Sequence, residues 1–225
     1  MAWWSKLKTK PKPDDQPAKP RWLAADQTPF GIEVLDCRPL TQTMLAVTGS
    51  FDIATNFTTS RQADGRDYVG KEPADARVIE CRLRYPFSGS KPPAGPLFKA
   101  AEMEDKWDLY VYDDTLYCVR SWTGDLLYSA RARFGDGEFG LEEMRFAGNA
   151  GELPQYSVRA LDFLIKSHVY NLGVPHPLVD ASTRDPEQLA VMSFSVFGRR
   201  AWFGAFEETV GLAAVERVLW GRTSN

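Results

Sequence analysis

The chain has 225 residues, 44% of them hydrophobic and 25% charged, with a formal net charge of −3 at pH 7. This composition excludes a fibrous repeat and a wholly disordered chain, and it lacks the basic excess of a dedicated nucleic-acid binder. The length suits one domain with a tail.

Residues 1–28 predict a flexible tail, because five lysines and four prolines stand there with little apolar surface to offset the entropy of ordering. One interpretation is a basic anchor, in which Trp3 and Trp4 touch an acidic surface or anionic lipid. The interpretation that we favour is a solvated extension whose Trp22 packs against the domain. We expect residues 29–225 to form a single α+β domain.

The first elements of this domain follow from local signals. Residues 31–40 predict a strand that ends at Pro39, and residues 50–61 predict a short helix capped by Ser50. Residues 77–87 alternate strictly, which predicts a half-buried strand. Its expected apolar face carries Ile79, Cys81, Leu83 and Tyr85.

Residues 107–134 predict a β-meander with two-residue turns at Asp113–Asp114 and at Thr123–Gly124. Turn length sets the register, so the side chains divide by parity between two faces. One face is expected to cover the helices with aromatic side chains: Tyr110, Tyr112, Tyr117, Tyr128 and Phe134. The other face is expected to gather a cluster at one end of the sheet: Trp107, Arg120, Trp122, Arg131 and Arg133.

The last third of the chain predicts helices. Residues 153–173 have Pro154 at the helix start, an apolar stripe, and Gly173 as a stop. Further helices are expected at 186–197 and 207–222, with a short strand within 199–206. Because βαβ alternation is missing, we expect an α+β fold in which an antiparallel sheet, a central β-meander at about 78–146, packs against C-terminal helices.

The cysteines indicate a reducing compartment. Cys37, Cys81 and Cys118 are odd in number, far apart and without CxxC spacing, which argues against a disulfide framework or a structural zinc site. We expect them to be reduced and buried. No window is apolar enough for a transmembrane segment, and the N-terminus lacks the apolar core of a signal peptide, so a cytoplasmic location is expected.

Signals of catalysis are weak, and we predict no cofactor and no metal. The acidic run Glu102, Glu104, Asp105 and Asp108 follows no known metal-loop spacing. Of the two histidines, His168 lies on the apolar helix stripe and is expected in the core, whereas His176 is expected in an exposed loop, where it could serve as a general base. Nucleophile-elbow, P-loop and HExxH motifs are missing.

Two further patterns resemble ligand-binding motifs only superficially. The glycines at 135, 137 and 140 imitate GxGxxG, but they join two expected strands, so a hairpin turn explains them. Arg199 and Arg200 stand between aromatic residues, as in single-strand binders, yet the acidic overall charge disfavours nucleic acid.

The predicted cluster leaves two functions open. Trp, Tyr and Arg dominate protein interfaces, so our leading prediction is a non-catalytic protein-interaction module, of the adaptor or inhibitor kind. The alternative is an enzyme or sensor that holds a small anionic ligand with the arginines, using Glu104, Asp108 or His176 as acid or base. The acidic run preceding the meander could instead neutralise the arginines, which is the structural interpretation of the cluster.

Overall fold

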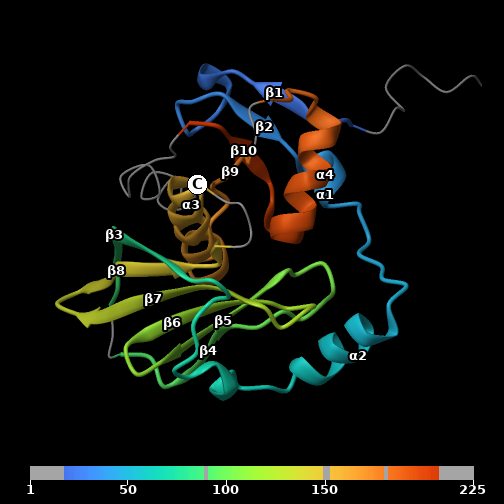
Figure 1. Ribbon diagram of the computed structural model, residues 1–225. Coiled ribbons are helices and arrows are strands. Elements are labelled where there is room, and N and C mark those ends of the chain that lie inside the picture. Colours follow the sequence, from blue (N-terminus) through green and yellow to red (C-terminus); the bar gives the residue numbers. More distant parts are fainter. Residues whose placement is uncertain (1–17, 89–90, 149–152, 180–181, 208–225) are drawn as a thin grey trace, which may run out of the picture.

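The computed structural model describes residues 18–88, 91–148, 153–179 and 182–207 (Figure 1). Within this part of the chain, a six-stranded antiparallel sheet, a four-stranded sheet and four α-helices form an α+β fold, as predicted. Residues 208–222 of the predicted last helix and residues 1–17 of the predicted tail lie outside the described residues.

Residues 107–134 form three consecutive antiparallel strands of the large sheet, as the predicted meander, and three further strands complete it. Its turns at Asp113–Asp114 and Asp136–Gly137 have positive φ at both residues, with φ values of 45° and 60°, and of 54° and 78°. Such turns match the twist of paired strands. In spatial order the strands are β3 (Arg77–Pro86), β8 (Glu138–Phe146), β7 (Leu126–Gly135), β6 (Thr115–Arg120), β5 (Trp107–Tyr112) and β4 (Gly95–Phe98).

One face of this sheet packs against α3 (Pro154–Leu164), which stands over it in Figure 1 and continues into a π-helical turn, Ile165–Val169. The apolar face predicted for β3 is the one that joins this core. A polar link crosses the same interface, because the Tyr85 hydroxyl donates to Asp162 at 2.8 Å and Lys166 pairs with Asp162 at 2.6 Å. The helix is therefore tied to the sheet by polar as well as apolar contacts.

The prediction that these aromatic side chains share one face, which covers the helices, is wrong. Tyr110, Tyr112 and Tyr117 form a separate cluster on the opposite face, whereas Tyr128 packs in the helix-facing core. The physical reason lies in the second connection of the meander, which is the five-residue loop 121–125 and not a two-residue turn. The ladder beyond it contains a register shift, so that Tyr128 pairs with Cys118. Parity carried across a two-residue turn therefore assigns β7 to the wrong face.

The tyrosine cluster is covered by the turn Arg66–Tyr68, whose Tyr68 ring stacks on Tyr110 at 5.8 Å, and α2 (Phe51–Ser60) precedes this turn in the chain. The predicted cap of α2 is confirmed, because Ser50 Oγ accepts a hydrogen bond from the Ile53 amide at 3.4 Å. Gly65 allows the covering segment to lie flat on the sheet. Its φ is +85°, and a Cβ there would stand 2.2 Å from the Tyr110 ring, so only glycine fits.

The small sheet joins the two ends of the described chain. Its order is β1 (Arg21–Leu23), β2 (Val34–Asp36), β10 (Phe203–Ala205) and β9 (Pro175–Pro177), and only the pair β10–β9 is parallel. The short α1 (Arg38–Thr41) contacts α4 (Pro186–Phe197) beside it.

The predicted tail differs from the structure at its C-terminal end. Residues 21–23 form β1, and Trp22 packs on the domain as expected: its ring stacks on Phe206 at 5.8 Å, and its indole N–H donates to the Arg184 carbonyl at 3.1 Å. Residues 18–28 therefore belong to the fold, because Trp22 buries its ring against a residue that lies far away in the sequence.

Candidate functional site

Two members of the predicted cluster meet at the C-terminal end of α4. The Arg120 guanidinium donates to the carbonyls of Val196 at 2.6 Å and Ser195 at 2.9 Å, and it lies 5.0 Å from the centre of the Trp107 ring. The Trp107 indole N–H also donates to Val196, at 2.8 Å. The last carbonyls of a helix lack intrahelical partners and form its negative end. Arg120 and Trp107 therefore cap a helix, and Trp107 is fully buried.

A third member, Trp122, lies in the loop 121–125 and covers a buried lysine. The Lys106 ammonium stands 3.8 Å from the centre of the Trp122 ring and 5.1 Å from that of Phe194. Lys106 and the Trp122 indole N–H both donate to the Met103 carbonyl, at 2.8 and 2.7 Å. Burial, with the nearby Arg120 charge, lowers the pKa of Lys106 to about 8. The faces of the two aromatic rings stabilise this cation.

Arg131 and Arg133 do not join the other three. Both lie on the opposite face of the sheet from Arg120, because Arg131 pairs with Thr115 while Ala130 and Ala132 occupy the helix-facing core. The single-face cluster that parity predicted is therefore not formed. The register shift in the β6–β7 ladder moves these two arginines away.

Two glutamates of β8 form ion pairs with these arginines. The β7–β8 ladder is irregular between Ala130 and Ala132, and the consecutive residues Glu142 and Glu143 both point to the outer face. Glu142 forms an ion pair with Arg133 at 3.0 Å, and Glu143 forms one with Arg131 at 3.2 Å. Glu142 also pairs with Arg84, and Glu143 with Arg145. The arginines are neutralised by cross-strand pairs, as in the structural interpretation, but not by the acidic run that it named.

That acidic run has other partners. Asp108 is buried and accepts from Lys99 at 2.7 Å and from the Ala100 amide at 2.8 Å. Glu102 accepts a hydrogen bond from the Arg199 guanidinium at 2.6 Å, and Glu104 accepts one from the Ala46 amide at 3.1 Å. Among the described residues, no group of three or more His, Cys, Asp or Glu side chains is placed to hold a metal ion.

The histidines are both core residues, so the exposed loop predicted for His176 is wrong. Pairing of β9 with β10 buries His176 completely against the rings of Phe163 and Phe197. Its Nδ1 lies 3.2 Å from the Pro177 carbonyl, which makes Nδ1 the protonated nitrogen, and its Nε2 has no partner among the described residues. Burial lowers the pKa of His176 to about 4.

The cysteines are free and buried, as predicted. Burial raises the pKa of the Cys37 thiol to about 12 and that of Cys81 to about 11. Thiolates carry the reactivity of cysteine, so these thiols are inert near neutral pH.

The surface that sequence reasoning missed is the connector 44–50 between α1 and α2, which crosses from the small sheet to the large one (Figure 1). Leu45, Val47 and Phe51, at the start of α2, are exposed to 71%, 82% and 82%. The apolar spacing at 45 and 47 could have indicated an extended segment, but nothing local shows that both side chains face solvent.

This connector lies at the same corner of the molecule as Trp122. The Ala46 amide is fixed to Glu104, next to Met103, whose carbonyl receives the Trp122 indole. On the other side, Asn56 of α2 donates to the Trp122 carbonyl at 2.6 Å. We name the side chains of Leu45, Val47, Phe51 and Trp122 the corner surface.

Comparisons with protein-family models, with curated proteins and with solved structures found no match to the chain. In the described part, none of the helices is both long and apolar enough to cross a membrane.

Proposed function

We propose that this chain is a non-catalytic protein-interaction module of the cytoplasm, which binds a partner protein through the corner surface. The observation that carries the proposal is the exposure of Leu45, Val47 and Phe51 on one short segment. Single exposed apolar residues are ordinary, but a contiguous group of them is typical of protein-binding surfaces. The buried free thiols support a reducing compartment.

The form of the segment favours a partner that accepts an extended peptide. Residues 44–50 belong to no helix or strand, and exposure alternates along them: Leu45 and Val47 are exposed, whereas Met44, Ala46 and Thr48 are partly buried, as in an extended chain. Leu45 and Val47 therefore act together, while the Ala46 amide between them holds the segment to Glu104. Partners that add a strand or offer alternate pockets recognise this arrangement.

The small-anion alternative receives less support from the contacts. The Arg120 guanidinium is engaged with helix carbonyls, and those of Arg131 and Arg133 with glutamates. A bound anion would have to displace these internal acceptors. The helix carbonyls would then lose their donor, and the glutamates would repel the anion.

The proposal is tested by capture from the native cell with the tagged full chain, followed by affinity measurement with the purified partner. We expect Val47→Asp and Phe51→Asp each to weaken binding by at least about tenfold, because a charge must then be desolvated at the interface. The matched control is Val78→Asp, which alters an exposed valine on β3. Equal affinity of all three variants, or no partner above background, would contradict the proposal.

Trp122 supplies a second test at the same surface. We expect Trp122→Ala to weaken partner binding while the fold remains intact, as judged by circular dichroism. Trp122→Phe separates the ring from the indole donor, since it keeps an aromatic face over Lys106. Unchanged affinity in Trp122→Ala, or its global unfolding, would remove Trp122 from the site.

A further inference from the structure

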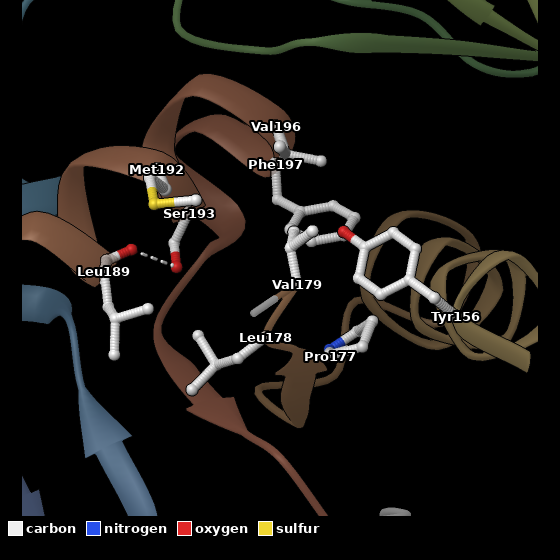
Figure 2. Close-up of a pocket in the computed structure, with 9 residues that line it drawn as sticks. All are labelled: Tyr156, Pro177, Leu178, Val179, Leu189, Met192, Ser193, Val196 and Phe197. Atoms are coloured by element: carbon white, nitrogen blue, oxygen red, sulfur yellow. Dashed lines mark hydrogen bonds between the residues drawn. The ribbon is translucent and has the colours of Figure 1, made fainter. Parts of the chain in front are cut away.

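Spaces between the elements of the described structure differ in what they can hold. Figure 2 shows one between α3 and α4, where side chains such as Tyr156, Leu178 and Phe197 converge. Its volume is about 10 Å³, which is barely enough for one water molecule. Another lies between the segment 68–74 and the start of β7, and its volume is about 610 Å³. This second space has the size of a small-molecule site, for which roughly 300–1,000 Å³ is typical.

The larger space, which we name the β7 cleft, combines apolar and charged side chains. Its less exposed lining residues are apolar or aromatic: Tyr68, Leu126, Leu127 and Ala147. Its exposed charged residues are Lys71, Glu72 and Asp125, and Ala74 and Gly124 complete the lining. The β7 cleft therefore has an apolar floor beside one aromatic ring and a charged rim.

Internal contacts fix the walls of the β7 cleft. The Tyr68 hydroxyl donates to the Gly124 carbonyl at 3.0 Å, and the Tyr68 ring stacks on Tyr110 at 5.8 Å. The other end of the segment 68–74 is held by the Gly148 amide, which donates to the Ala74 carbonyl at 3.2 Å. The cleft is therefore formed before a ligand arrives, which lowers the entropic cost of binding.

The charges at the rim balance and leave two groups available to a ligand. Glu72 is neutralised by Arg145, at 3.2 Å. The Lys71 ammonium makes no hydrogen bond or ion pair with the described residues, and Asp125 has Oδ2 engaged by the Thr123 hydroxyl but not Oδ1. One ammonium and one carboxylate oxygen thus remain, so a neutral ligand with both donors and acceptors is favoured over an anion or a cation.

A sugar ring has the chemistry that this lining can recognise. Each sugar hydroxyl both donates and accepts, so Lys71 can donate to one hydroxyl while Asp125 accepts from another. The C–H groups of a pyranose are apolar and slightly positive, which suits the negative face of an aromatic ring. Tyr110 stacks on one face of Tyr68 and leaves the other face for this contact.

We infer that the β7 cleft binds a neutral saccharide, with Tyr68 as the stacking platform, Asp125 as acceptor and Lys71 as donor. None of these residues belongs to the corner surface, so sugar binding goes beyond the proposed function and can be tested apart from it. Burial of the apolar sugar face against Leu126 and Leu127 adds to the affinity.

A microarray of neutral oligosaccharides, built from glucose, galactose, mannose, xylose and N-acetylglucosamine, is probed with the full chain. The sugar that binds best is then titrated calorimetrically into the wild type and its variants. We expect Asp125→Ala to weaken binding by at least about tenfold, because a charged acceptor is lost. The matched control is Asp26→Ala, at an exposed aspartate outside the cleft, which is expected to keep the wild-type affinity.

Variants of Tyr68 separate its ring from its hydroxyl. Tyr68→Phe keeps the ring and is expected to retain most of the affinity, whereas Tyr68→Ala is expected to lose at least about fivefold because the stacking surface is removed. Circular dichroism establishes that each variant is folded. Should Tyr68→Ala fail to fold, Asp125→Ala and Lys71→Ala decide, since both alter exposed side chains.

Four results would overturn the inference. The first is that no neutral sugar on the array binds, and the second is that binding is confined to charged sugars. The third is an unchanged affinity in Asp125→Ala and Lys71→Ala. The fourth is loss of sugar binding in Phe51→Asp, which would place the sugar at the corner surface.

Discussion

Buried groups that could carry charge are the main feature at the scale of single residues. Lys106 is held by two aromatic rings and one carbonyl, and its pKa is lowered to about 8. His176 sits in an aromatic environment, and burial lowers its pKa to about 4. Burial favours the neutral form of both side chains. The free energy of unfolding therefore depends on pH through these two groups.

His176 yields a prediction about acid stability. Its folded pKa of about 4 lies below the ordinary histidine value of 6.5, so the folded state favours neutral imidazole. The stability contribution is present above pH 6.5 and is lost as the pH falls toward 4, by roughly 3 kcal/mol at most. Urea unfolding of the wild type and His176→Phe at pH 7, 5 and 4 measures it. We expect the variant to lose less stability on acidification, and identical losses would contradict the assignment.

At the scale of elements, the arginines predicted as one cluster have different structural roles. Arg120 joins β6 to the end of α4 by two hydrogen bonds, whereas Arg133 forms an exposed pair with Glu142. Hydrogen bonds from a charged donor to the last carbonyls of a helix are stabilising, while surface ion pairs contribute little.

The pair Arg120→Met and Arg133→Met tests this difference. We expect Arg120→Met to reduce the free energy of unfolding by about 2 kcal/mol, because the Ser195 and Val196 carbonyls lose a donor. Arg133→Met is expected to change it by less than about 0.5 kcal/mol, since its ion pair is exposed to solvent. Urea denaturation compares the two, and equal effects would show that Arg120 does not cap α4.

At the scale of the whole molecule, contacts connect the two sheets through the helices. α3 contacts both β3 and β9, and the large core cluster includes Phe197 and Ala201 as well as residues of the meander. Gly198 completes the connection: its φ is +65°, and a Cβ would stand 1.8 Å from the Glu104 carbonyl oxygen, so the backbones touch where only glycine fits.

We therefore propose that the two sheets unfold as one cooperative unit, in agreement with a single domain. Urea transitions followed by far-ultraviolet circular dichroism, by tryptophan fluorescence and by hydrogen exchange of the small-sheet amides are expected to share one midpoint. An earlier transition confined to β1, β2, β9 and β10 would contradict this expectation.

The sequence by itself determined the features that depend on a few neighbouring residues. Ser50 as a cap, the Asp113–Asp114 turn, the alternation of β3 and the start of α3 at Pro154 were all readable, because capping, turn and periodicity signals span one to four positions. The antiparallel meander followed from these local features.

Only the tertiary structure decided which side chains meet. The five-residue loop 121–125 and the register shift beyond it separate Arg131 from Arg120, and a parity argument has no means of detecting either. Pairing of β9 with β10 buries His176, and pairing of β1 with β2 draws Trp22 into the fold. These outcomes depend on contacts between residues distant in sequence, whose free energies arise from burial and long-range pairing and not from local propensity.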